Sequence, residues 1–273
     1  MMILQKKPQQ HLQEFSQICE TILGIDAKSI VDNAKQLTKY YKGTGDEREK
    51  SRELQFLENR WYDGLKKGFA DYGIYSEKVY LSDMWACWSI YSRKYLMNIQ
   101  KLTSTTQLLN GVTKIVDMGC GAGLTTAAFK QIFPNANVIG VNIEDTAQIK
   151  LCRHFANIYG FNISTDINEI GSDVDVVFAS EYFEHIKEPI THLEDIIRIM
   201  NPKMMIIANA FGTISVGHFN EYTINGSEIH GKKSNRIFSA AMRKAGYTMI
   251  KCGWWNNKPN VWVRHLDKSL EIV

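Results

Sequence analysis

A glycine-rich segment in the middle of the chain is the feature of the sequence with the clearest chemical meaning. Residues 117–123 read DMGCGAG; they overlap the end of an apolar run at 114–118 and lead into a stretch with helical periodicity at 123–133. Glycine permits a tight turn and a close approach of the backbone to a ligand, and the free N–H groups at the start of a helix favour an anionic group. The order strand, glycine-rich turn, helix therefore predicts a ligand site at this turn.

A second polar position follows the next predicted strand. The run 137–142 ends at Asn142, where folds with such a turn usually bind a ribose through an acidic residue. Asn142 can hold a diol by itself, and Glu144, two residues on, is the alternative. NAD is one ligand that a glycine-rich turn of this kind can bind. Two details count against it: the third glycine comes one position too early for a GxGxxG turn, and Asp117 suits an ammonium group better than a diphosphate.

The elements that position this turn alternate between short apolar runs and longer amphipathic stretches, which is typical of strand–helix–strand units in a parallel sheet. The predicted strands are 114–118, 137–142, 174–180, 204–210, 248–253 and 260–265. The predicted helices between them are 123–133, 145–159, 188–200 and 234–246. The last two strands have only a turn at 255–258 between them, so we expect an antiparallel hairpin.

The first part of the chain, residues 1–110, has helical periodicity and predicts a separate helical module. We expect helices over residues 9–23, over the stripe from Ile30 to Tyr41, over 47–62, and after Ser82, a good N-cap residue. Aromatic residues are frequent here, and most of them should belong to the core.

Composition limits the class of protein. The chain has 273 residues, of which 44% are hydrophobic and 22% charged, so it can bury at least one full core. No apolar run is long enough to span a membrane, and the N-terminal residues lack the apolar core of a signal peptide, so we expect a soluble cytoplasmic protein with no membrane partner. The five cysteines include no CxxC pair, which favours reduced thiols.

The charge pattern gives one possible interaction surface. The formal net charge of +3 is too balanced for a dedicated nucleic-acid or membrane-surface protein. Lysines and arginines nevertheless gather in the segment 232–264, which contains no acidic side chain. Basic segments of this length are more often a solvated face than a ligand surface. A nucleic acid or another anionic substrate is the alternative for this one.

The segment from about 113 to 265 resembles the class I S-adenosylmethionine-dependent methyltransferases. The DMGCGAG turn is similar to that family's hallmark loop, VIGVNI at 138–143 to its second strand, and VDVVFASEYFEHI at 174–186 to its fourth strand and the turn after it. The resemblance implies a doubly wound, mostly parallel seven-stranded sheet with a C-terminal antiparallel hairpin, formed by a Rossmann-like domain over residues 111–273. It also implies S-adenosylmethionine as cofactor, and residues 1–110 as a lid or substrate cap.

The resemblance assigns cofactor-binding residues. The loop would hold the methionine part, Asn142 the ribose, and Ile143 the adenine ring. Asp166 would accept from the adenine amino group, with a loop-capping aspartate as the alternative, and Ser180 and Glu181 would lie beside the sulfonium. The predicted set is Asp117, Gly119, Cys120, Gly121, Gly123, Asn142, Ile143, Asp166, Ile167, Ser180 and Glu181.

Catalysis of methyl transfer requires alignment of a nucleophile behind the methyl group, and a general base only for acceptors such as amines and hydroxyls. The catalytic candidates are Glu184, His185, His218 and Glu221. The turn with Glu184 and His185 has a structural role in many relatives, and this alternative stays open. The sequence predicts no metal site.

A small-molecule acceptor is the leading prediction for the substrate. A nucleic-acid base or a nucleotide is the alternative, although the strand ending at Ser180 is not followed by the DPPY motif of amino-methylating DNA enzymes. A cofactor-binding scaffold without catalysis is the other alternative. We expect the acceptor at the long connection 211–231, for which an ordered surface loop or a small extra hairpin is the alternative. In the helical module, Tyr72, Tyr75 and Tyr80 are the candidate lid residues. The sequence does not indicate an oligomeric state.

Overall fold

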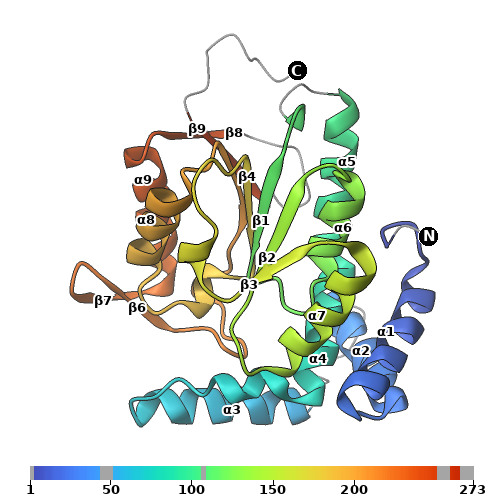
Figure 1. Ribbon diagram of the computed structural model, residues 1–273. Helices are drawn as coiled ribbons and strands as arrows, with labels where there is room; N and C mark the ends of the chain where they lie inside the picture. The colour runs from blue at the N-terminus through green and yellow to red at the C-terminus, as the bar shows by residue number, and fades with distance from the viewer. Residues whose placement is uncertain (1–2, 44–51, 106–108, 251–258, 265–273) are drawn as a thin grey trace.

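The computed structural model describes residues 3–43, 52–105, 109–250 and 259–264, and its centre is a seven-stranded sheet (Figure 1). The strands are β1 (Lys114–Met118), β2 (Asn137–Val141), β3 (Asn162–Ser164), β4 (Val176–Ser180), β5 (Met204–Ala208), β8 (Tyr247–Ile250) and β9 (Asn260–Arg264). Their order is β3-β2-β1-β4-β5-β9-β8, and β9 is antiparallel to both of its neighbours while the other pairs are parallel. The predicted fold class, with its antiparallel last strand pair, is confirmed.

Helices cover both faces of the sheet. They are α6 (Leu124–Ile132), α7 (Ala147–Tyr159), α8 (Pro189–Met200) and α9 (Gly231–Lys244). In Figure 1, α8 and α9 lie on one side of the sheet and α6 and α7 on the other. Strands β1, β4 and β5 are buried almost along their whole length, as expected for parallel strands covered on both faces.

The differences from the predicted sheet elements are small and have local causes. Strand β3 was not among the predicted strands, because it has only three residues and none of them is fully buried. The strand predicted over 248–253 is observed as β8, and residues 251–253 and the predicted turn at 255–258 lie outside the described residues.

The N-terminal part is helical, as predicted. Its elements are α1 (Pro8–Leu23), α2 (Ala27–Tyr41), α3 (Arg52–Lys66), the short η2 (Tyr72–Ser76), α4 (Lys78–Cys87), a π-helical turn η3 (Trp88–Ser92) and α5 (Arg93–Thr105). The prediction that a helix starts after Ser82 is wrong. Ser82 is buried inside α4, where its hydroxyl donates to the carbonyl oxygens of Lys78 (3.0 Å) and Ile30 (3.3 Å), so it joins α4 to α2 instead of capping a helix.

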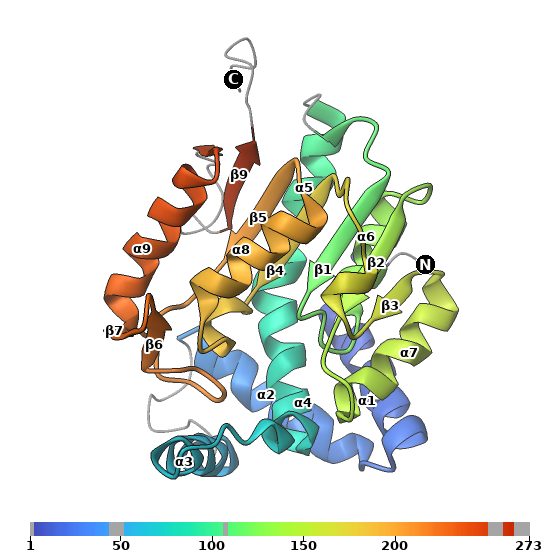
Figure 2. The same ribbon diagram turned by 60° about the vertical axis from the view of Figure 1, so that its left-hand side comes forward.

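Helices α2, α3 and α4 lie at the end of the sheet where the parallel strands finish, whereas α5 runs back along the same side of the sheet as α6 (Figures 1 and 2). Helix α5 packs against α6, and α1 packs against α7. The buried apolar residues of the helical part and of the sheet form one continuous core. The N-terminal helices are therefore built into the same core as the sheet, and they close one end of it.

The long connection after β5 contains a small hairpin. Strands β6 (Glu221–Ile224) and β7 (Ser227–His230) pair antiparallel in a separate two-stranded sheet. The alternative interpretation of this segment is thus correct for residues 221–230. Among the described residues, no helix combines the length and the apolar character needed to cross a lipid bilayer.

Candidate active site

The glycine-rich turn lies between the end of β1 and the start of α6, against side chains from distant parts of the chain. Gly119 and Gly121 have φ angles of +67° and +55°, which favour glycine. A Cβ atom on Gly119 would lie 2.5 Å from the Tyr182 ring, and one on Gly121 would lie 2.8 Å from Sδ of Met84. The turn is thus enclosed by the segment after β4 on one side and by α4 on the other, and neither position has room for a side chain.

Asp117, on β1, is a buried acid directly before this turn. One of its carboxylate oxygens accepts a hydrogen bond of 2.6 Å from the hydroxyl of Thr126. Burial raises the pKa of Asp117 to about 7, although this hydrogen bond acts in the opposite direction. The carboxyl group lacks a cationic partner among its hydrogen-bond and ion-pair contacts in the described residues, so a positively charged ligand group would stabilise its ionised form.

A cavity of about 400 Å³ opens beside the turn. Predicted site residues in its wall are Asp117, Gly119, Cys120, Gly121, Ser180, Glu181, His185 and His218. Other parts of the wall come from α4, η3, α5 and the segment between β5 and β6. We call this the inner cavity. It brings together the ends of β1 and β4, which are neighbours in the sheet although β2 and β3 separate them in the chain.

A second cavity of about 440 Å³, the outer cavity, adjoins the first. The two share wall residues, namely Tyr80, Gly119, Gln148, Glu181 and His185. The outer cavity also contains the predicted nucleoside-binding positions Asn142, Ile143, Asp166 and Ile167. Together the cavities form an elongated site at the point where the strand order reverses between β1 and β4, which is where open α/β sheets bind ligands.

Asn142 is held in place by the backbone. Its side-chain N–H donates to the carbonyl oxygen of Gly121 (2.8 Å), and its side-chain oxygen accepts from the N–H of Ile143 (2.9 Å). Glu144 forms an ion pair with Arg153 (2.6 Å) and belongs to the wall of neither cavity. Of the two alternatives for the ribose, only Asn142 therefore lies in the site.

Gly123 is the one member of the predicted glycine set that the structure places elsewhere. It precedes α6 with a φ of +83°, and a Cβ there would lie 2.9 Å from both Cys152 and Phe161. It lines neither cavity. It packs α6 closely against α7 and against the residue before β3, and the structure does not bring it together with Gly119 and Gly121 at the cavities.

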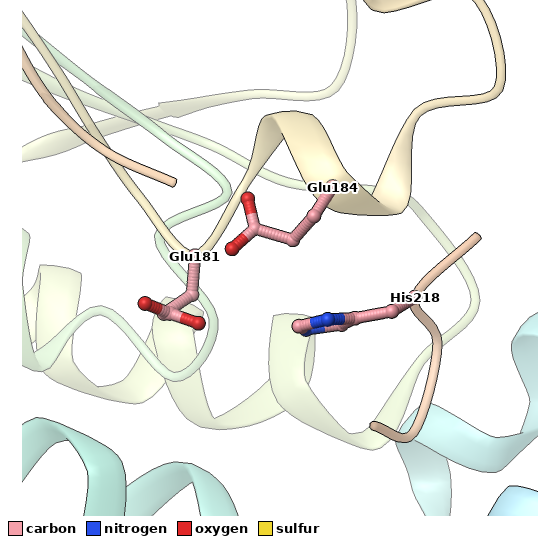
Figure 3. A group of neighbouring side chains, drawn as sticks. All are labelled: Glu181, Glu184 and His218. Carbon is pink, nitrogen blue, oxygen red and sulfur yellow. The ribbon is translucent and has the colours of Figure 1, made fainter. Parts of the chain in front are cut away.

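Two of the four catalytic candidates follow β4 directly. Glu184 is fully buried, and one of its carboxylate oxygens accepts from the N–H of Ala210 (2.8 Å). Its other oxygen, Oε2, is buried without a hydrogen-bond partner. Burial, and secondarily the negative charge of Glu181, raise the pKa of Glu184 well above its usual value. Figure 3 shows Glu181 and Glu184 close together, with the ring of His218 beside them.

His185 and His218 lie against each other with ring centroids 4.7 Å apart and ring planes at 89°. Nδ1 of His185 is 3.0 Å from the hydroxyl of Tyr75, and burial and the neighbouring His218 lower the pKa of His185 well below its usual value. Nδ1 of His218 lies 2.9 Å from the carbonyl oxygen of Thr213, so it carries the proton of the neutral ring and Nε2 is the basic nitrogen.

Glu221, the fourth candidate, lies outside the site. It is exposed on β6 and lines neither cavity. The hairpin pairing of β6 with β7 carries it away from the cavities, so the structure does not bring Glu221 together with the other three catalytic candidates. His218, only three residues earlier, does reach the inner cavity.

The helical part supplies site residues that the sequence did not single out. The π-helical turn places Trp88, Tyr91 and Ser92 in the wall of the inner cavity. Such turns are frequent at functional sites. Gln148 of α7 lines both cavities. Helical spacing indicated that these residues face inward, but it could not separate the core from a cavity wall.

The basic segment lies apart from the site. No lysine or arginine of residues 232–264 that the structure describes lines either cavity. Several of them extend along α9, and Arg243 packs over the ring of Trp262.

Comparison with known proteins supplies the remaining observations. The family model described as a methyltransferase domain matches residues 109–251, which is more than half of the chain. A search of curated protein sequences finds no match.

Several solved structures are similar to this chain at low sequence identity. The apo form of the S-adenosylmethionine-dependent methyltransferase SibL is 15% identical over 86% of this chain and 73% of that chain, with a TM-score of 0.50. The mitomycin 7-O-methyltransferase MmcR is 14% identical over 96% and 73%, with a TM-score of 0.46. The N-terminal domain of EvdMO1 with SAH bound is 14% identical over 60% and 77%, with a TM-score of 0.43.

Proposed function

Because the chain belongs to the methyltransferase-domain family and S-adenosylmethionine is its cofactor, we propose that it transfers the sulfonium methyl group to a small-molecule acceptor in the inner cavity. The observation that carries the proposal is the pair of adjoining cavities. The outer one holds the residues assigned to adenosine, and the inner one extends from the glycine-rich turn past Ser180 and Glu181 to the histidines.

In this arrangement the carboxylate of Asp117 and the turn at Gly119 and Gly121 bind the methionine part of the cofactor. Asn142 faces the ribose, and Ile143 and Asp166 face the adenine. The methyl group then points into the inner cavity near Glu181. An acceptor atom there attacks the methyl carbon in line, the carbon–sulfur bond breaks with its electron pair on sulfur, and S-adenosylhomocysteine remains.

The size and walls of the inner cavity favour a small acceptor. A volume of about 400 Å³ is within the range of small-molecule sites, and aromatic side chains of the helical part close it. The basic segment, which would contact a nucleic acid, is not part of either cavity. We further propose that residues 1–110 act as a cap, because Tyr72, Tyr75 and Tyr80 line the outer cavity.

Calorimetric titration tests the cofactor assignment, and a product assay tests the transfer. We expect one S-adenosylhomocysteine bound per chain and no binding of NAD. With S-adenosylmethionine labelled in the methyl group, a small-molecule fraction of a cell extract should acquire the label. Label only in nucleic acid would contradict the small-acceptor proposal, and cofactor binding without any labelled product would favour a non-catalytic scaffold.

Replacing Asp117 by Asn tests the role of this carboxylate in binding the cofactor ammonium. Since the pKa of the free carboxyl is about 7, the wild-type affinity for S-adenosylhomocysteine should fall about tenfold per pH unit below pH 7 and level off above it. D117N should bind weakly, with no such pH dependence. Calorimetry between pH 5.5 and 8.5 measures both.

The stability of the unliganded protein supplies the control for this variant. A raised pKa means that the stabilising contribution of Asp117 is full below its unfolded value and is lost as the pH rises towards 7. D117N should therefore melt at a higher temperature than the wild type at pH 8, while it binds the ligand less tightly. A variant that loses both stability and binding would instead assign Asp117 a structural role.

A further inference from the structure

Two carboxylates and one imidazole form a cluster at the inner cavity, in which Glu181 and His218 line the wall and Glu184 is buried behind it. Glu181 follows β4, Glu184 lies in the single turn η6 (Phe183–His185), and His218 lies on the segment between β5 and β6. One ligand atom from each of the three lies within 4.8 Å of the others. Figure 3 shows these groups converging from two separate segments.

The buried Glu184 carboxylate points to a missing partner. Glu184 has no exposed surface, and its Oε2 has no hydrogen-bond partner although Oε1 is held by the N–H of Ala210. Burying an unpaired carboxylate oxygen is costly, so native structures usually supply a proton or a cation at such a position. The hydroxyl of Ser180, in the wall of the same cavity, is also buried without a partner.

The environment of His218 is the one that a metal-binding histidine requires. Nδ1 lies 2.9 Å from the carbonyl oxygen of Thr213, so the ring orientation is fixed and the lone pair is on Nε2. Metal-binding histidines usually donate their other ring N–H to such an oxygen. The His218 backbone is held as well, because its carbonyl oxygen accepts from Nε1 of Trp61 (2.7 Å).

We propose that Glu181, Glu184 and His218 bind one divalent first-row transition-metal ion such as Mn²⁺. Two carboxylates balance the charge of the ion, and the imidazole favours a transition metal over Ca²⁺. With metal–ligand distances of about 2.1 Å, two ligands of one ion are at most about 4.2 Å apart, so small rotations of these side chains suffice. This inference departs from the sequence prediction of no metal site.

The position of the ion suggests the class of acceptor, a step that rests on the proposed methyl transfer. Glu181 and His218 line the inner cavity, so the open coordination positions face the space in which the acceptor would lie. A hydroxyl bound there has a lowered pKa and loses its proton to water. The resulting alkoxide or phenolate oxygen forms the bond to the methyl carbon, and sulfur retains the electron pair of the broken bond. The acceptor is thus an oxygen nucleophile.

To test the site, the full chain is first treated with a chelator and then titrated with Mn²⁺. Electron paramagnetic resonance measures the concentration of free Mn²⁺ at each step. We expect one Mn²⁺ per chain. E184Q and H218N should each weaken binding at least about a hundredfold, since loss of even an outer partner of a metal ligand costs 10- to 100-fold. E221Q is the matched control, because Glu221 is an exposed glutamate just outside the cavities, and it should bind as the wild type does.

The melting temperature and the affinity for S-adenosylhomocysteine, measured on each variant, keep the outcomes separate. Folded variants that bind S-adenosylhomocysteine but not Mn²⁺ support the proposal. A wild type that binds S-adenosylhomocysteine but no Mn²⁺ overturns the metal site, leaves the methyltransferase assignment intact, and indicates that the two carboxylates share a proton. Mn²⁺ binding that both substitutions leave unchanged places the ion elsewhere and also overturns it. If E184Q does not fold, the affinity of H218N for Mn²⁺ alone tests the proposed site.

Discussion

Replacing Gly119 by Ala should reduce the affinity for S-adenosylhomocysteine about a hundredfold, which corresponds to about 2.8 kcal/mol. The φ angle of +67° is unfavourable for alanine, and the new methyl group would lie 2.5 Å from the ring of Tyr182. That ring cannot turn away freely, because its hydroxyl is bonded to Nε2 of His192 (2.8 Å). Since Gly119 lines both cavities, the shift of the turn or of the ring occurs inside the binding site. Calorimetry with S-adenosylhomocysteine measures the change.

Gly226 provides the matched control. It lies in the turn between β6 and β7 with a similar φ of +74°, but a Cβ there would meet nothing within 4 Å. G226A therefore carries the backbone penalty without the steric contact, and its affinity for the ligand should equal that of the wild type. If G119A binds S-adenosylhomocysteine as tightly as G226A does, the glycine-rich turn does not form the cofactor site.

Replacing Trp61 by Ala should lower the free energy of unfolding by about 3–5 kcal/mol and abolish most of the turnover. Trp61, in α3, is completely buried, and its ring packs against Phe219 with centroids 5.3 Å apart. Its indole N–H donates to the carbonyl oxygen of His218. The substitution leaves a large hole beneath the segment that carries His218 to the inner cavity. Urea unfolding measures the first effect, and turnover far below the melting temperature measures the second.

Two further variants separate packing from hydrogen bonding at this position. W61F keeps most of the ring but leaves the carbonyl oxygen without its donor, so the loss of stability should be about 1–3 kcal/mol. Phe56 lies in the same helix with 64% of its surface exposed, and F56A should leave stability and turnover unchanged. Two separate unfolding transitions in the wild type, of which W61A changes only one, would contradict the single continuous core.

The local parts of the site could be predicted from the sequence because their geometry depends on neighbouring residues. A turn that needs positive φ angles requires glycine, and a strand that is buried on both faces requires an apolar run, so the run at 114–118 and the segment DMGCGAG at 117–123 predicted the strand and the glycine-rich turn. Glu181 and Glu184 belong to the segment after β4, which the sequence predicted to be the turn that follows the fourth strand. Only a turn separates the last two predicted strands, with no room for a helix between them. The sequence therefore also predicted the antiparallel end of the sheet.

The rest was decided by contacts between distant segments, which periodicity does not encode. Ser82 has the residue type of a helix cap, but packing of α4 on α2 placed it inside a helix. Glu221 and His218 are three residues apart, and pairing of β6 with β7 removed one from the cavity while the bond from Trp61 held the other in it. Gly123 has the sequence context of a ligand-binding glycine, yet it packs against Cys152 of α7 and Phe161, just before β3. The sequence by itself determined the sheet and the glycine-rich turn. Only the tertiary structure could bring His218 to the two glutamates, because His218 is held by Trp61, which lies 157 residues earlier in the chain.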